Sequence, residues 1–90
     1  MARGDGETTR QMQEAPQGAV FVWCNDSLDY PRHVAAKVGR TDLQIVRPGW
    51  LDYEKWRGLE LTGLVVDHAI SLAGARRRQY TEALTRVRSH

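Results

Sequence analysis

The sequence predicts a small α/β domain with a three-stranded parallel sheet and a basic C-terminal helix. Three short segments, at residues 19–24, 42–47 and 63–67, have the length of strands, and the first and third contain continuous apolar runs. Segments with helical spacing follow each run, and no hairpin-length turn joins one run to the next. This β-α-β-α-β-α pattern is typical of a parallel sheet.

The first predicted strand and helix are bounded by clear signals. Residues 19–24 form a continuous apolar run that stops at Asn25-Asp26-Ser27. Pro31 suits a first helical turn, and Tyr30, Val34 and Val38 recur at helical spacing. We expect a helix over residues 30–38, with Gly39 as its C-cap, leading by a right-handed crossover to the second strand.

The later elements follow the same logic. A short helix is expected from Asp52 to Arg57, ended by Gly58, and the third strand at residues 63–67 follows it. An apolar stripe of helical spacing then predicts a final helix over residues 74–88. Residues 18–90 should therefore form a single domain with a thin core.

Residues 1–17 are polar and lack periodicity, so they predict a disordered or loosely attached tail. If this segment does order, the expected piece is a short helix over residues 9–15. The sequence shows no apolar leader and no apolar run of the roughly 20 residues that span a bilayer. Together with the lone Cys24, this favours a soluble cytoplasmic protein without a membrane partner.

The carboxyl ends of the three strands should bring polar side chains to one edge of the sheet. Carboxylates there suit a hydrated Mg²⁺, and an arginine beside a helix N-terminus suits an anion. The alternative is that the acids cap helices and turns and that the arginine pairs with one of them. The edge residues are Asn25, Asp26, Ser27, Arg47, Asp67 and His68.

The run Leu64-Val65-Val66-Asp67-His68-Ala69 resembles the Walker B strand of P-loop NTPases. That resemblance implies an aspartate, Asp67, that organises Mg²⁺. The loop after the first strand, however, has neither the glycines nor the lysine of a phosphate-binding loop, and no Gly-x-Gly-x-x-Gly follows that strand. We therefore expect no ATP hydrolysis, and the fold expectation becomes a degenerate P-loop-like or Rossmann-like domain.

Other catalytic and metal-binding patterns are missing from the sequence. Ser27 and Ser71 lack a nucleophile elbow, and Cys24 lies in an apolar run. The three histidines are widely separated, and one cysteine cannot complete a structural zinc site. The sequence therefore favours a non-enzymatic protein without a cofactor or metal.

Three of the seven aromatic residues lie within one short segment. Aromatic residues and arginine dominate interface hot spots, so this segment is a candidate anchor for a protein partner. The alternative is that one tryptophan plugs the sheet and the others cover its edge. The candidate residues are Trp50, Tyr53, Trp56 and Arg57.

The positive charge is concentrated at the C-terminus. Residues 1–75 carry eight Lys and Arg against ten Asp and Glu, a net charge of −2, whereas residues 76–90 carry five Arg and one Glu, a net charge of +4. This face could be simply solvated, contact nucleic acid or bind an acidic partner. Its residues are Arg76, Arg77, Arg78, Arg86 and Arg88.

The Arg-, Ala- and Val-rich, Lys-poor composition resembles that of small accessory proteins of phages that infect high-GC bacteria. The resemblance implies a protein that acts by binding a host or phage protein. A three-stranded sheet also leaves two unpaired edges, so a homodimer is a further expectation. The aromatic segment is the preferred binding surface, with nucleotide or Mg²⁺ binding at the strand ends and nucleic-acid binding by the C-terminal helix as alternatives.

Overall fold

The computed structural model describes residues 3–88, with side chains described from residue 6 onward. Helices and strands alternate after an additional N-terminal helix. In chain order the elements are α1 (Arg3–Glu14), β1 (Val20–Val22), α2 (Asp29–Lys37), β2 (Gln44–Val46), α3 (Gly49–Asp52), β3 (Leu64–Val66) and α4 (Gly74–Leu84).

The sheet has three parallel strands in the order β2-β1-β3. In the central strand, Phe21 lies opposite Ile45 of β2 on one side and Val65 of β3 on the other. This topology is Rossmann-like and confirms the α/β class predicted from the three strand-length segments. The strands are shorter than those segments, because only three residues of each segment keep ladder pairing.

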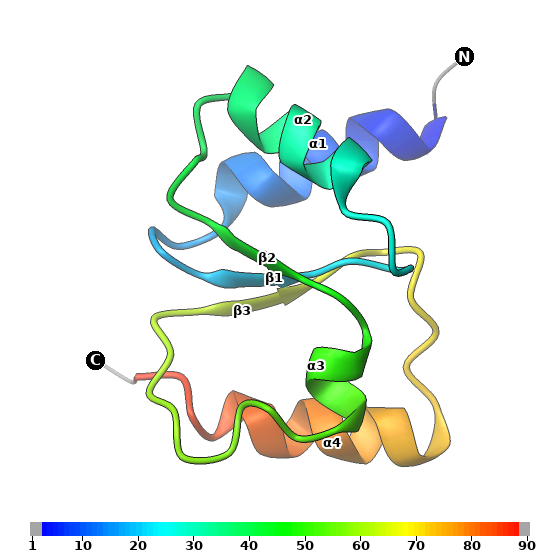
Figure 1. Cartoon of the computed structure of the whole chain (residues 1–90), viewed down its shortest axis with the longest axis vertical. Coiled ribbons are helices and arrows are strands. Elements are labelled where there is room, and N and C mark those ends of the chain that lie inside the picture. Colours follow the sequence, from blue (N-terminus) through cyan, green and yellow to red (C-terminus); the bar gives the residue numbers. More distant parts are fainter. Residues whose placement is uncertain (1–2, 89–90) are drawn as a thin grey trace.

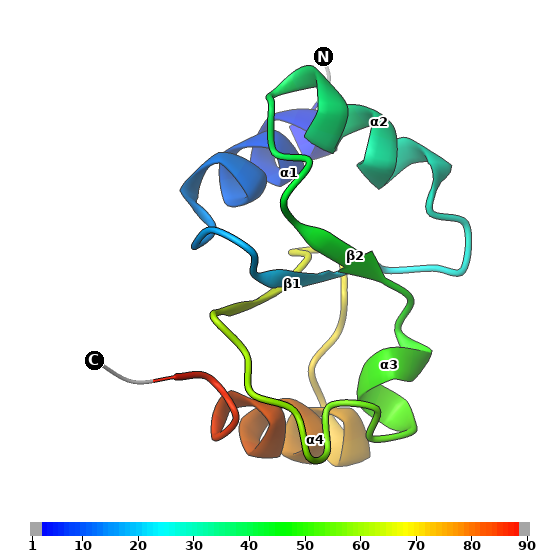
Figure 2. The ribbon, with the colours of Figure 1, turned by 60° about the vertical axis from the view of Figure 1, so that its left-hand side comes forward.

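Helices cover both faces of the sheet (Figure 1). Helices α1 and α2 lie on one face, and α3 and α4 lie on the other. Figure 2 shows the same two layers from another side, with the sheet between them. The molecule is therefore a three-layer α/β/α sandwich, and β1 is its buried centre.

Two apolar cores fill the spaces between these layers. The alternation of side chains along β1 sends Phe21 into the core beneath α1 and α2, and sends Val20 and Val22 into the core above α3 and α4. All three side chains are almost fully buried. Met12 belongs to the first core and Trp56 to the second.

Residues 3–17 are not the loosely attached tail that their polar composition predicts. Residues 3–14 form α1, and Met12 is 0% exposed and Ala15 8% exposed in the first core. Thr8 is also buried, at 2% exposed. The helix also starts earlier than the 9–15 segment expected if this region ordered. The prediction for residues 1 and 2 lies outside the described residues.

A charged clamp holds the end of α1 to the body of the protein. Arg40 donates hydrogen bonds to the carbonyl oxygens of Met12 and Pro16, and it forms a two-pronged ion pair with Asp42. Asp42 also accepts a 2.7 Å bond from the Gly18 amide. The Arg40 hydrogen bond, and then the Gly18 amide, hold the pKa of Asp42 well below its usual range.

The helix after β1 agrees with its prediction to within a residue at each end. Gly39 follows it with a φ of 74°, as its C-cap role requires. The segment after β2 differs, since α3 begins at Gly49 and ends at Asp52 instead of beginning there. Turns then lead to Gly58.

The last helix is also shorter than predicted, since α4 ends at Leu84. The chain after it runs beside Leu61, whose amide donates to Arg86 and whose carbonyl accepts from the Arg88 amide at 2.7 Å. Within the described part of the chain, no helix has the length and apolar character that crossing a membrane would need.

Candidate functional site

Asp67 follows β3 directly and lies in the interior at 1% exposed. One carboxylate oxygen accepts a 3.0 Å hydrogen bond from the Thr8 hydroxyl, and the other accepts a 3.0 Å bond from the Ala69 amide. The His68 ring nitrogen Nδ1 lies 3.5 Å from the same carboxylate. Asp67 is therefore partnered by α1 and by its own turn, as buried polar groups generally are.

Gln11 of α1 completes the cover over the end of β3. Its amide group donates to the Val66 carbonyl at 3.0 Å, and its side-chain oxygen accepts from the His68 amide at 3.0 Å. The same oxygen lies 3.3 Å from His68 Nδ1. Helix α1, which the sequence predicts only as a short helix over residues 9–15 if this region orders, thus lies across the strand end that was predicted to receive a ligand.

The loop after β1 forms a separate part of this edge. Asn25 accepts a bond from the Ser27 amide at 3.0 Å, which is a local turn, and Arg47 Nε donates to the Asp26 carbonyl at 2.9 Å. Burial, followed by the charge of Asp67, raises the pKa of the nearby Cys24 thiol. No group of three or more potential metal ligands gathers among the described residues.

The aromatic segment is divided between the core and the surface. Trp56 is 1% exposed, and its ring N–H donates to the Leu51 carbonyl at 3.2 Å, so it cannot serve as the surface anchor that was predicted. Tyr53 is 78% exposed and Trp50 is half-buried. Trp56 is thus the tryptophan that plugs the sheet.

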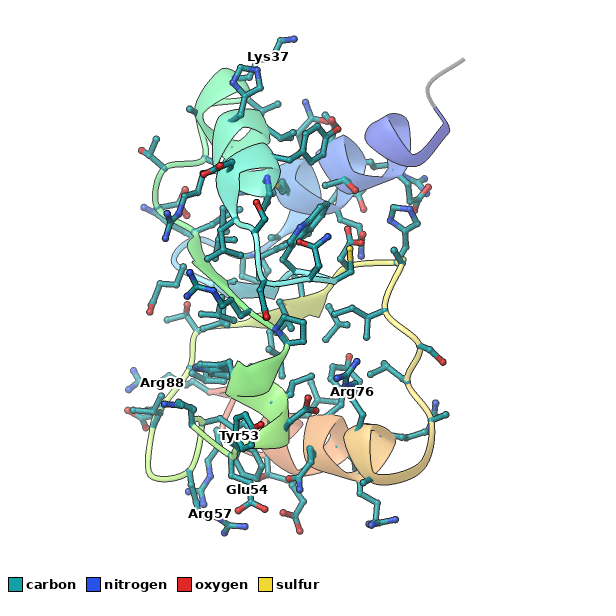
Figure 3. The ribbon with its side chains drawn as sticks, turned by 45° about the vertical axis from the view of Figure 1, so that its right-hand side comes forward. Lys37, Tyr53, Glu54, Arg57, Arg76 and Arg88 are labelled. Atoms are coloured by element: carbon teal, nitrogen blue, oxygen red, sulfur yellow. The ribbon has the colours of Figure 1, made fainter. Side chains whose placement is uncertain are left out.

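Arg57 is tied to its neighbours on the surface. Its guanidinium lies 5.2 Å from the centroid of the Trp56 ring and pairs with Glu54 at 2.7 Å. The Arg57 bond, and then the Gln79 bond, lower the pKa of Glu54. Figure 3 shows Tyr53, Glu54 and Arg57 close together on the outer side of α3.

The five C-terminal arginines do not form one face. Arg76 makes a bidentate pair with Asp52, with a shortest distance of 2.7 Å, and so joins α4 to α3. Arg88 pairs with Glu60 at 2.6 Å, and Arg86 lies beyond the helix with its Nε buried and without a hydrogen-bond partner among the described residues. Figure 3 places Arg76 and Arg88 at opposite ends of the α3–α4 layer. Only Arg77 and Arg78 remain exposed on α4 without an ion pair to the described acids.

A cavity of about 370 Å³ opens at the carboxyl end of β2, between the start of α2 and the segment that contains α3. We call it the basic-aromatic pocket. A Cβ at position 49 would lie 3.3 Å from the Tyr53 ring, so that ring packs directly on the backbone of Gly49. The pocket is lined by Leu28, Arg32, Ile45, Val46, Arg47, Gly49, Trp50, Tyr53 and Lys55.

The charged groups of this pocket all have the same sign. Arg32, Arg47 and Lys55 line it, and none of the lining residues is acidic. From residue 6 to residue 88, no acidic side chain lies within ion-pair distance of these three cations. The cavity can therefore hold an anionic group beside two aromatic rings.

Arg47, Trp50 and Tyr53 are site residues predicted from the sequence, but at two different sites. Arg32 and Lys55 are not predicted, because no short motif connects them. A usable signal was present, since Arg32 lies one turn into the helix after β1 and Arg47 directly follows β2. Adjacent parallel strands bring such positions to the same edge of the sheet.

The protein is thus a small α/β domain of Rossmann-like topology with a positively charged cavity at its carboxyl edge. Comparisons with models of protein families, with curated proteins and with solved structures find no match.

Proposed function

We propose that this protein is a non-enzymatic interaction protein that binds an acidic segment of a protein partner in the basic-aromatic pocket. The observation that supports this proposal is the grouping of Arg32, Arg47 and Lys55, without ion-paired acids, around Trp50 and Tyr53. Of the surface expected from the sequence, the proposal retains Trp50 and Tyr53, leaves out Trp56 and Arg57, and adds the pocket cations.

The two kinds of side chain contribute differently to binding. An exposed ion pair contributes only about 0–1 kcal/mol, and salt screens it. Trp and Tyr contribute larger free energies when a partner covers them, because they bury much apolar area at a small entropic cost. The cations would therefore select an acidic partner and accelerate its association, while Trp50 and Tyr53 would hold it.

The composition of the pocket favours binding over catalysis. No carboxylate, imidazole, thiol or serine hydroxyl is among its lining residues, so Lys55 and Tyr53 are its only side chains of the types that act as general bases or nucleophiles. The nucleotide or Mg²⁺ alternative has less support, because Asp67 is enclosed by Thr8 and its own turn.

The test uses a fluorescent oligo-glutamate peptide, with an oligo-glutamine peptide of the same length as its neutral control. We expect the glutamate peptide to bind with an affinity that falls as salt rises. Lys55→Glu should weaken this binding about tenfold or more, because a repulsion replaces an attraction. Tyr53→Ala should also weaken it.

The matched control is Lys37→Glu, which makes the same change in net charge on the exposed end of α2, far from Tyr53 (Figure 3). It should leave the affinity nearly unchanged. Equal losses in the two charge-reversal variants would contradict the proposed site. Tighter binding of a single-stranded oligothymidine than of the peptide would replace the protein partner with nucleic acid, since aromatic and basic side chains also suit unpaired bases.

A further inference from the structure

The outer side of β2 has free backbone hydrogen-bonding groups. The Gln44 amide donates to Ala19, and the Val46 carbonyl accepts from Trp23, each at 2.9 Å, so residues 44 and 46 face β1. Peptide groups alternate in direction along a strand, which turns the N–H and C=O of Ile45 away from β1. Because β2 is an edge strand, these two groups lie on the open border of the sheet.

Cavities flank this border at both ends. The basic-aromatic pocket lies at the carboxyl end of β2, and a second cavity of about 200 Å³ lies between α2 and the amino end of β2. Arg32 and Ile45 line both cavities, so the two are neighbours along the strand. Figures 1 and 2 show β2 at the border of the sheet, with α2 on one side and α3 on the other.

The opposite border, at β3, is partly closed. There the Gly63 carbonyl and the Asp67 amide face β1, so Leu64 and Val66 face outward. The outward Val66 carbonyl already accepts the 3.0 Å bond from the Gln11 side chain of α1. The two borders therefore differ, because α1 binds part of the β3 border, whereas the outward residue of β2 lies between two cavities.

We propose that an extended acidic segment of the partner pairs with β2 as a fourth strand of the sheet. This inference rests on the proposed function and specifies how the partner binds. Main-chain bonds to Ile45 would supply affinity, and side chains on alternate positions of the added strand would enter the two flanking cavities. Acidic side chains would lie near Arg32, Arg47 and Lys55.

A second copy of this chain fits the β2 border less well than an acidic segment does. Two β2 strands paired about a two-fold axis would be antiparallel, so the carboxyl end of each would lie beside the amino end of the other. At that amino end Asp42 is already paired with Arg40. A second copy therefore offers the pocket cations no unpaired acid there, whereas an acidic segment does, and charge complementarity favours the acidic segment.

The test measures hydrogen exchange of the Ile45 amide by NMR with two peptides of equal charge. An alternating Glu-Val peptide can add as a strand, whereas an alternating Glu-Pro peptide cannot donate a regular set of main-chain bonds. We expect the Glu-Val peptide to bind about tenfold more tightly and to slow exchange at Ile45. The Glu-Pro peptide should leave exchange at Ile45 unchanged.

Ile45→Pro supplies the second measurement. It removes an outward N–H without removing a ladder bond to β1, a position at which edge strands accept proline. It should weaken the binding of the Glu-Val peptide about fivefold and leave the binding of the Glu-Pro peptide unchanged. Ile45→Val, which keeps the N–H, is the matched control. If Ile45→Pro does not fold, the exchange measurement on the unaltered protein decides alone.

The outcomes separate this inference from the proposed function. In one outcome both peptides bind equally, Lys55→Glu weakens the binding of both, and exchange of the Ile45 amide stays unchanged. That outcome would overturn strand addition and keep the acidic-partner function. No binding of either peptide would overturn both. If exchange of the Ile45 amide slowed as the protein concentration rose, with no peptide present, a second copy would occupy this border. That outcome would overturn the proposal that an acidic segment binds there.

Discussion

Asp67 was predicted to contact a ligand, but it is buried and hydrogen-bonded inside the protein. Its carboxylate lies beneath α1, where the Thr8 hydroxyl and the Ala69 amide are its hydrogen-bond donors. A buried carboxylate that loses a donor carries a desolvation cost that water no longer offsets. Thr8 and Asp67, which are far apart in the sequence, therefore act as one polar unit that docks α1 on β3.

Thr8→Val tests this unit, because it keeps the side-chain shape and removes the hydroxyl. We expect a loss of about 2 kcal/mol in the free energy of unfolding, the size typical of a bond to a charged group. Urea unfolding followed by circular dichroism measures it. Thr9→Val, at the next position of α1, is the control and should change stability by less than about 0.5 kcal/mol. Equal effects of the two substitutions would show that the Thr8 hydroxyl has no special role.

Asp42 gives a prediction about pH. Its folded-state pKa is lowered first by Arg40 and then by the Gly18 amide, so its contribution to stability is present above its unfolded pKa of about 3.9 and is lost as the pH falls toward the folded value. Asp42→Asn should therefore be least stable relative to the unaltered protein above about pH 5, and the difference should shrink below about pH 4.

Urea unfolding over a series of pH values measures this difference. Asp26→Asn, in the exposed loop after β1, is the control, because it makes the same change in net charge. Its effect on the free energy of unfolding is subtracted from that of Asp42→Asn. The range from about pH 7 to about pH 3 spans the unfolded pKa of an aspartate. If the difference in the free energy of unfolding between Asp42→Asn and the unaltered protein stayed constant over this range, the role of the ion pair would be contradicted.

At the scale of elements, the central strands and α2 could be predicted because their signals are local. Continuous apolar runs and the spacing of Val34 and Val38 each lie within one element. Helix α1 has no such signal, since Met12 is the only buried apolar residue among its residues 6–14, and polar contacts of Thr8 and Gln11 hold the helix to β3. Those contacts join residues more than fifty positions apart, so no local pattern contains them.

The candidate site has the same division between local and distant information. Spacing identified Trp50, Tyr53 and Trp56 as a group, but it could not tell which ring the sheet would bury. The basic-aromatic pocket joins Arg32 of α2 with Arg47 and Lys55, which follow β2 and α3. Only the strand order places these three cations together.

Met12→Ala tests whether α1 is part of the folded unit. Met12 is fully buried, and truncation of such a residue to alanine costs about 2–4 kcal/mol through lost burial and a residual cavity. Gln13→Ala, at an exposed position of the same helix, should change stability by less than about 0.5 kcal/mol. Urea unfolding compares the two. A Met12→Ala protein as stable as the Gln13→Ala protein would instead support the interpretation of this segment as a loosely attached tail.

At the scale of the whole molecule, the two cores depend on one strand. Phe21 fills the core beneath α1 and α2, while Val20 and Val22 fill the core above α3 and α4. Losing either layer of helices would expose one face of β1 to water. A small domain of this design should unfold in a single cooperative step.

Each core contains one buried tryptophan that can report on it, Trp23 beneath α1 and α2 and Trp56 above α3 and α4. In a protein with Trp50→Phe and Trp56→Phe, fluorescence follows the first core, and in a protein with Trp50→Phe and Trp23→Phe it follows the second. We expect the urea midpoint by fluorescence to equal the midpoint by far-ultraviolet circular dichroism within each variant, because the shared β1 couples the cores. Comparing two signals within one variant removes the effect of the substitutions on stability. An earlier fluorescence midpoint in only one variant would mean that its layer of helices separates first and that β1 does not couple the two cores.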